Sequence, residues 1–325
     1  MKEIFIKGMT YGWDTTRGAY RTPEAVHSLE MLKETGSEWI ALSFFTYQET
    51  FSSTEITFDY NHTMTDRDIE FAVKKAKELG LKVCLKPVVN SRDGLWRARI
   101  TFPEDATDYW NKWFASYENF LLHYAELAQE LDCEMFCVGC EMIGTESRVE
   151  QWEQVISKVR EVYTGPLIYN ANHGKEEGVE WFDKVDVIGT SAYYPVAEKP
   201  GDTEENMIKN WEKVKGKLVN LHKKFNKPIL FMEIGCRSAE GCATMPWDFT
   251  STELPFNEEE QANFYRSVMK VFWDEPWFAG FFWWDWSTKL YPLEEAKTNT
   301  YFDIYGKEAE SVVKEWYNKP VSSKQ

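Results

Sequence analysis

Eight apolar segments alternate with helical segments along the chain, and this alternation constrains the fold more than any other feature. Most of these segments are continuously apolar, which is typical of parallel strands that helices cover on the outside. Eight such units predict an α/β chain folded as a single (β/α)₈ barrel over residues 1–325. A doubly wound open sheet is the alternative, but no glycine-rich phosphate loop follows the first strand. The strands are expected at residues 3–11, 37–45, 81–89, 133–141, 166–172, 185–193, 228–235 and 278–286.

Signals for helix ends support this alternation. Thr65 is the expected N-cap of one helix, and Gly80 follows the end of the same helix. Asn257 is the expected cap of a later helix, whose first turn is acidic where carboxylates meet the positive end of the helix dipole. Helices are also expected over residues 23–35, 108–131, 204–225 and 306–318, after Thr145 and, for a short stretch, near Trp181.

The chain is strongly acidic, and this narrows the class of partner. It carries 37 Lys and Arg against 53 Asp and Glu, a net charge of -16. Such a surface repels phosphate backbones, so no nucleic acid partner is expected, and a neutral substrate fits better. No segment approaches the roughly 18 apolar residues of a membrane span, so no membrane partner is expected either. We also expect a monomer.

Cysteine usage and the first residues indicate a compartment. Six cysteines, several of them within expected strands, favour a reducing compartment over a disulfide framework. The opening MKEIFIKGMTYGW has too short an apolar run, and carries charge too early, for a signal peptide. We therefore expect a cytoplasmic protein, or a secreted one if a leader has been removed.

Two glutamates end apolar strands, Glu141 in CVGCEM and Glu233 in LFMEIG. The active site of a (β/α)₈ barrel lies at the carboxyl ends of its strands, so side chains ending strands four and seven face each other across the mouth. Glycosidic bond cleavage needs such a pair. One carboxyl group protonates the leaving oxygen, and the other attacks the anomeric carbon or activates water; a separation of about 5 to 5.5 Å predicts retention of configuration. Either glutamate alone is compatible with a structural role, but the pair favours catalysis.

A family resemblance is carried by seven stretches between about residues 7 and 286: KGMTYGW with GAYRTPEAVHSLEMLKETG, LSFFTYQETFSS, LKPVVN with GLWRARITF, FCVGCEM, DVIGTSAYYP, LFMEIGCRS and GFFWWDW. Together they resemble glycoside hydrolase family 113, which belongs to the clan of retaining (β/α)₈ glycosidases and whose known members are mostly β-1,4-mannanases. The resemblance implies a retaining endo-β-1,4-mannanase that acts on mannan or mannooligosaccharides and needs no cofactor. It also implies Glu141 as the acid/base and Glu233 as the nucleophile.

The sequence differs from the pattern of the clan at Cys140. Many members of the clan carry an asparagine at this position, directly before the acid/base, where it binds the sugar's 2-hydroxyl. A thiol is a poor substitute donor, so that contact must come from elsewhere. The mechanism also needs a raised pKa for Glu141, from apolar walls or a charged neighbour, and donors that keep Glu233 ionised. Tyr193 or Tyr194 is expected to supply one donor. Neighbours on a strand alternate, and we favour Tyr193.

Further substrate-binding candidates follow other strands. The resemblance implies that Trp284 forms the floor of the subsite for the cleaved sugar, whereas Trp283 points the other way because strand neighbours alternate. Aromatic rings stack on sugars but also fill cores, and polar side chains bind hydroxyl groups but also form turns. The candidates on these grounds are Trp13, Gln48, Lys86, Asn90, Trp96, Asn170, Asn172 and Asp285.

Five cysteines invite other interpretations that we do not favour. Cys133, Cys137 and Cys140 have a spacing that resembles a zinc site. However, Cys137 and Cys140 are expected on opposite faces of their strand, and the five histidines form no ligand pair, so no metal is expected. Cys236 and Cys242 are expected to be free thiols rather than a bridge.

Three other polar features are expected to be ordinary surface groups. We expect Arg237 in an ion pair at the rim, His173 in a solvated loop, and the run KEEGVEWFDK on a solvated face.

Other functions stay open. The same mechanism serves a glucanase, a galactanase or an exo-mannosidase, because the axial 2-hydroxyl of mannose is recognised by pocket geometry. A barrel that binds sugar without cleaving it would use the same aromatic residues, although the presence of both glutamates argues against it.

Overall fold

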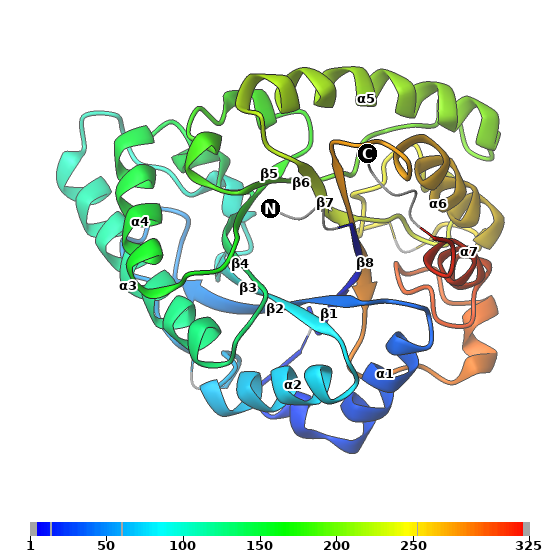
Figure 1. Cartoon of the computed structure of the whole chain (residues 1–325), viewed down its shortest axis with the longest axis horizontal. Helices are drawn as coiled ribbons and strands as arrows, with labels where there is room; N and C mark the ends of the chain where they lie inside the picture. Colours follow the sequence, from blue (N-terminus) through cyan, green and yellow to red (C-terminus); the bar gives the residue numbers. More distant parts are fainter. Residues whose placement is uncertain (1–4, 14, 60, 252, 321–325) are drawn as a thin grey trace.

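Eight strands form one closed parallel barrel in chain order (Figure 1). The computed structural model describes residues 5–13, 15–59, 61–251 and 253–320. β1 pairs in parallel with both β2 and β8, which closes the sheet and confirms the predicted (β/α)₈ barrel. Residues 3 and 4 of the first expected strand lie outside the described residues. The strands are β1 Ile6–Tyr11, β2 Trp39–Gln48, β3 Lys82–Ser91, β4 Met135–Cys140, β5 Leu167–Asn172, β6 Val187–Ser191, β7 Ile229–Ile234 and β8 Phe278–Trp286.

Helices cover the outside of the barrel, and their ends carry the expected caps (Figure 1). The Thr65 hydroxyl accepts a hydrogen bond from the Asp68 N–H at 3.2 Å, and the Asp68 carboxylate accepts one from the Thr65 N–H at 3.0 Å. Gly80, just beyond the same helix, has a φ of 72° that favours glycine. The Asn257 side chain accepts a hydrogen bond from the Glu260 N–H at 3.0 Å.

The α-helices are α1 Pro23–Lys33, α2 Asp66–Glu78, α3 Thr107–Glu130, α4 Val149–Val162, α5 Glu204–Phe225, α6 Glu258–Phe272 and α7 Glu308–Tyr317. The connection from β5 to β6 contains two short 3₁₀ turns, η4 Glu176–Gly178 and η5 Phe182–Lys184. Within the described ranges, no helix is long and apolar enough to cross a membrane.

Apolar side chains pack on both sides of the sheet. Alternate strand positions point into the barrel, as strand geometry requires. Phe282 fills the space beside Gly8, where a Cβ atom would lie 2.4 Å from the ring, so a larger residue cannot stand there. The interior cluster consists of Ile6, Trp39, Ala41, Cys84, Met135, Cys137, Ile168, Val187, Leu230, Met232, Ala279 and Phe282. The larger outer cluster packs the sheet against the helices.

An irregularity in β4 changes which side chains face inward near the mouth. The register between β4 and β5 shifts between Cys137 and Gly139, and the two successive residues Val138 and Gly139 both face the helical layer. Cys140 therefore turns back toward the barrel interior, the side on which Cys137 also lies. The expectation that these two cysteines point to opposite faces is wrong, because it assumed unbroken alternation.

The substitution Leu230→Ala tests the interior cluster, since this β7 side chain is fully buried. We expect the free energy of unfolding to fall by about 2 to 5 kcal/mol, because lost burial and a residual cavity add together. Urea denaturation followed by tryptophan fluorescence measures the loss. The control Leu293→Ala removes the same atoms at a position that is 58% exposed. Equal losses in both variants would contradict the packing described.

Candidate active site

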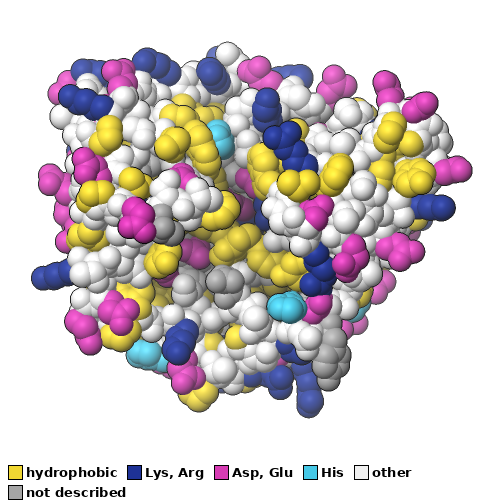
Figure 2. All heavy atoms as spheres, turned by 180° about the vertical axis from the view of Figure 1, so that it is seen from behind, with side chains coloured by type: hydrophobic (Ala, Val, Ile, Leu, Met, Phe, Trp, Pro, Cys, Tyr) yellow, Lys and Arg dark blue, Asp and Glu magenta, His cyan; other side chains and the backbone are white. Residues whose placement is uncertain are grey.

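Glu141 and Glu233 lie at the carboxyl ends of β4 and β7, on the same rim of the barrel. Figure 2 shows a face that is hollowed near its centre, with hydrophobic side chains around the hollow and acidic side chains within it. Glu141 has a left-handed φ of 53°, and its N–H donates to the Asn170 carbonyl oxygen of β5 at 2.7 Å. Each glutamate is only 6% exposed, so each needs partners that replace lost water.

Four donors converge on Glu233. Lys86 of β3, which is fully buried, forms an ion pair with Oε1, and Asn170 Nδ2 donates to the same oxygen at 3.1 Å. Cys140 Sγ donates to Oε1 at 3.3 Å, and burial raises the pKa of this thiol well above its usual range, so it keeps its proton. Tyr193 Oη donates to Oε2 at 3.1 Å, which is the expected hydrogen bond. Together these donors fix both carboxylate oxygens.

Arg97 is the charge partner of Glu141. Its Nη1 donates to Oε2 at 2.7 Å, and Trp96 Nε1 donates to the same oxygen at 3.0 Å. Asn172 Nδ2 donates to Oε1 at 3.2 Å. Burial raises the pKa of Glu141, but the charge of Arg97 and these hydrogen bonds outweigh it, so the pKa lies below its ordinary value. The expectation of a raised pKa is therefore wrong, because it left out Arg97.

Arg97 is held from behind by Asn90, whose Oδ1 accepts a hydrogen bond from Nε at 3.2 Å. Asn90 was expected to bind substrate, and the structure instead gives it a contact to the partner of Glu141. Asp285 is partly exposed at the end of β8, and its charge contributes to a raised pKa of Tyr193, after the larger effect of burial.

The two glutamates share one pocket. Asn170 and Asn172 lie two residues apart on β5 and donate to Glu233 and Glu141 respectively. Burial raises the pKa of Tyr193 well above its usual range, and the charges of both glutamates add to this effect. Both glutamates therefore lie beside β5 and close to Tyr193.

Aromatic rings line the pocket on the β8 side. Trp284 packs with Tyr193 and meets Trp13 at a centroid distance of 4.4 Å. Trp283 lies on the other side of the strand, stacked on Tyr265 of α6 at 3.9 Å. Trp284 thus faces the mouth and Trp283 the helices, as strand alternation predicts.

Tyr194 points away from the glutamates, into the helical layer. Its hydroxyl donates to Glu176, whose carboxylate also accepts a hydrogen bond from Thr190 Oγ1 at 2.6 Å. Tyr194 was the less favoured donor to Glu233, and alternation with Tyr193 turns it outward. Glu176 is only 5% exposed, so the expected solvated face of KEEGVEWFDK is wrong at this residue.

Another buried carboxylate, Glu146, lies just behind Glu141. Its Oε1 accepts a hydrogen bond from Tyr169 Oη at 2.5 Å, and the same Tyr169 oxygen accepts one from the Met142 N–H at 3.1 Å. Burial raises the pKa of Glu146 to about 7, with smaller contributions from the charges of Glu176 and Glu141. These contacts support the backbone directly after Glu141.

Three residues have surroundings that differ from expectation. Gln48 is buried and donates to backbone carbonyls of the segment after β2, so it holds that segment. Arg237 is buried, and its Nε donates a hydrogen bond to the backbone carbonyl oxygen of Thr300 at 2.8 Å. This contact replaces the ion pair that was expected at the rim. His173 is stacked against Trp247 with centroids 5.2 Å apart, rather than standing in solvent.

All six cysteines are buried free thiols. Cys236 and Cys242, expected as free thiols, lie with their sulfur atoms 3.3 Å apart. Across the part of the chain that the structure describes, no group of three or more His, Cys, Asp and Glu side chains could hold a metal ion.

Arg97 and the thiol of Cys140 are the site residues that sequence reasoning missed. Arg97 stands in the stretch GLWRARITF, directly after Trp96, and this neighbouring position is the one signal for it in the sequence. Its pairing depends on the path of the segment after β3, which no local pattern specifies.

The family model and the similar solved structures all point to the same family of glycoside hydrolases. A family model described as Glycoside Hydrolase Family 113 matches residues 9–307. A solved structure of a GH113 β-1,4-mannanase shares 37% identity over 98% of this chain and 100% of its own, with a TM-score of 0.90. The GH113 β-mannanase AaManA from Alicyclobacillus acidocaldarius, in complex with ManMIm, shares 40% identity over 97% of each chain, with a TM-score of 0.89.

A more distant likeness concerns the fold alone. The β-D-glucuronidase of Dictyoglomus thermophilum is 17% identical and matches with a TM-score of 0.65, covering 99% of this chain and 52% of its own. A search of curated proteins found no match.

Arg97→Met should raise the pKa of Glu141, because the buried carboxylate loses its cation while methionine keeps much of the side-chain volume. Carbon-13 NMR titration of labelled glutamate carboxyl groups measures the change. Arg99→Met is the control, since Arg99 lies in the same turn but is exposed. A Glu141 pKa that stays the same or falls in Arg97→Met would contradict the ion pair.

Glu146→Gln should stabilise the protein at high pH. The folded-state pKa of about 7 lies above the ordinary 4.5, so the stability that protonated Glu146 contributes is fully present below about pH 4.5 and is lost as the pH rises through about 7. The loss is at most about 3 kcal/mol, and glutamine avoids it. Urea denaturation at about pH 5 and pH 8 measures the difference, with the exposed Glu150→Gln as control. The same pH dependence in Glu146→Gln and wild type would disprove the assignment.

Proposed function

Because the chain belongs to glycoside hydrolase family 113, we propose that it is a retaining endo-β-1,4-mannanase that hydrolyses mannan or mannooligosaccharides. The observation that carries this proposal is the pair Glu141 and Glu233, held by separate sets of donors in one pocket. The choice of mannan is supported by the similar solved structures, which are described as β-1,4-mannanases.

In the first step, Glu233 attacks the anomeric carbon of the bound sugar. The carbon–oxygen bond to the leaving chain breaks, and Glu141 gives its proton to the departing oxygen. A covalent glycosyl–enzyme ester forms, and the shortened chain leaves as an alcohol. Lys86 and Tyr193 hold the two oxygens of Glu233, so the attacking atom needs little reorientation.

In the second step, Glu141 acts as a base. It takes a proton from water, the water oxygen attacks the anomeric carbon, and the ester bond to Glu233 breaks. Two inversions at the same carbon give net retention. Arg97 favours the ionised form of Glu141 that this step requires. The first step requires the proton, which the carboxyl group regains more easily once the glycan excludes water from the pocket.

Substrate binding is assigned to the aromatic and polar groups around the pair. Trp284 and Trp13 form an apolar floor on which a sugar ring can stack. Asn170 lies 3.3 Å from Cys140, the position at which the clan often carries asparagine. We therefore assign the contact to the sugar's 2-hydroxyl to Asn170, whose amide oxygen is a stronger acceptor than the thiol and accepts no hydrogen bond among the described residues. Trp96 is 43% exposed beside Glu141, so its indole face is available to a sugar at the rim.

The proposal is tested by activity on defined substrates. The wild type should release reducing ends from β-mannan and mannooligosaccharides, and not from xylan or carboxymethylcellulose. Proton NMR of the first product should show the β-anomer. Glu141→Ala and Glu233→Ala should each lower the rate at least about 10²-fold, because each removes a group that takes part in bond breaking.

Azide distinguishes the two roles. With an aryl β-mannoside that has a good leaving group, Glu233→Ala plus azide should give the α-mannosyl azide, since azide enters from the side of the missing nucleophile. Glu141→Ala should give the β-mannosyl azide, since azide then attacks the glycosyl–enzyme. Full activity in either alanine variant would refute the site. Cleavage of another β-glycan in place of mannan would keep the mechanism and change the substrate, and binding without cleavage would refute catalysis.

A further inference from the structure

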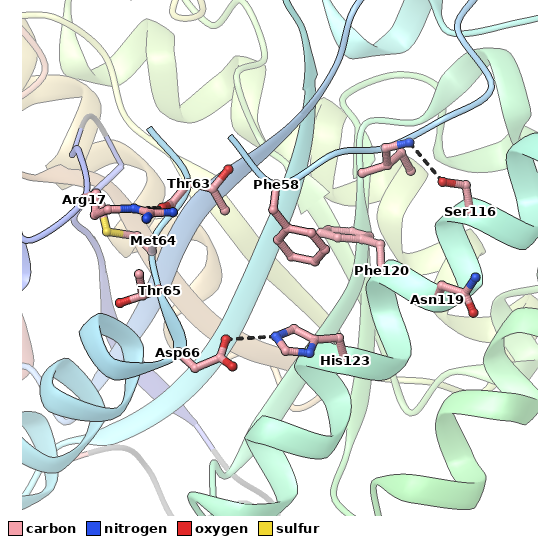
Figure 3. Close-up of a pocket in the computed structure, with 11 residues that line it drawn as sticks. Arg17, Phe58, Thr63, Met64, Thr65, Asp66, Ser116, Asn119, Phe120 and His123 are labelled. Atoms are coloured by element: carbon pink, nitrogen blue, oxygen red, sulfur yellow. Dashed lines mark hydrogen bonds and ion pairs between the residues drawn. The ribbon is translucent and has the colours of Figure 1, made fainter. Parts of the chain in front are cut away.

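A cavity whose lining includes neither glutamate lies on the flank of the barrel (Figure 3). It has a volume of about 500 Å³ and lies between the segment that follows β2 and helix α3. This volume falls within the range of small-molecule sites. The lining residues used below are Phe58, Asp66, Ser116, Asn119, Phe120 and His123.

An aromatic surface forms one wall of this cavity. Phe58 is 54% exposed, so part of its ring is open to solvent. Its ring is supported from behind by His123 and Tyr124, at centroid distances of 5.6 Å and 6.1 Å. Phe120 lies next to it in the view of Figure 3. The result is a fixed ring with an accessible face.

Polar groups surround the same surface. His123 Nε2 and Asp66 Oδ1 form a contact of 2.8 Å at the edge of the cavity. Ser116 Oγ accepts a hydrogen bond from the Ile56 N–H at 2.9 Å, so its own proton is free to be donated. Asn119 is exposed on the same face of α3. An apolar ring with hydroxyl, amide and carboxylate groups around it matches the apolar faces and hydroxyl edges of a neutral sugar.

The cavity is also connected to the mouth of the barrel by a row of aromatic rings. Successive centroid distances are 4.4 Å from Trp284 to Trp13, 4.2 Å to Phe45, 6.2 Å to Tyr47 and 6.3 Å to His62. His62 precedes Thr63, which lines the cavity. A long glycan that leaves the pocket along this row reaches the segment that carries Phe58.

We propose that this cavity is a second carbohydrate-binding site, which holds a distant part of the glycan chain whose other end lies in the catalytic pocket. The identity of the glycan as β-mannan rests on the proposed function. The site would strengthen binding of polymers without contributing to the cleavage of short substrates, because only long chains reach both places.

Affinity electrophoresis in gels that contain soluble β-mannan tests this proposal. All variants carry Glu233→Ala, so that the polymer is not cleaved. Phe58→Ala should weaken retardation roughly two- to tenfold, the range expected for one aromatic contact, and Asn119→Ala should weaken it further. Tyr109→Ala is the control, since Tyr109 is an exposed aromatic residue of α3 outside the cavity lining. It should bind as its parent does.

Kinetics separate this inference from the proposed function. With an intact Glu233, Phe58→Ala should lower kcat/KM for polymeric mannan and leave kcat/KM for mannotriose unchanged, which also shows that the variant folds. Equal binding of mannan by Phe58→Ala and its parent would overturn the second site and leave the proposed function intact. If the wild type neither binds nor cleaves mannan, the proposed function fails, and gels with xylan or glucan decide the second site. In those gels, retardation that Phe58→Ala weakens supports the second site. Equal retardation of Phe58→Ala and its parent, or no retardation of either, overturns it.

Discussion

The parallel pairing of β1 with β8 closes the sheet, and the position of every site residue depends on that closure. A closed parallel barrel brings all eight strand ends to one rim, whatever their distance along the chain. Lys86, Glu141 and Glu233 come from strands three, four and seven, yet they lie in one set of contacts. An open sheet would place β1 and β8 at opposite edges, and Trp13 would lose its packing against Trp284.

Closure of the barrel also buries the carboxylates of Glu141 and Glu233. A separate set of donors offsets the cost of burying each charge. Glu233 has Lys86, and Glu141 has Arg97. Burying an ion is costly unless it is paired and hydrogen-bonded, so each glutamate has a cation and further donors. Separate compensation lets the two groups differ: the donors to Glu233 are all buried, whereas one donor to Glu141 is the exposed Trp96. This difference matches the roles proposed for them.

The sequence was sufficient for the barrel, for the helix caps and for the pair of glutamates at the rim. These features depend on local patterns, namely apolar strands, capping side chains and residues that directly end a strand. The choice of Tyr193 over Tyr194 and of Trp284 over Trp283 also succeeded, because it needed only strand alternation. The same rule failed for Cys137 and Cys140, where β4 is irregular.

Contacts that depend on the path of loops could not be predicted from sequence patterns. Arg97 was overlooked, and with it the direction of the Glu141 pKa shift. Arg237 and Glu176 were assigned to the surface, yet both are buried, because segments distant in the chain cover them. Such burial depends on how loops cross the rim, and no periodicity in the chain records that path.

The irregular step in β4 has a consequence for how such a chain can change. Two neighbours there face outward in succession, and only then does Cys140 turn toward Glu233. Deleting one residue between them would restore regular alternation and still leave Cys140 facing inward, whereas a regular strand of the present length would turn the thiol toward the helices. Gly139 is itself hard to replace, because a Cβ atom there would lie 2.9 Å from the Tyr117 hydroxyl.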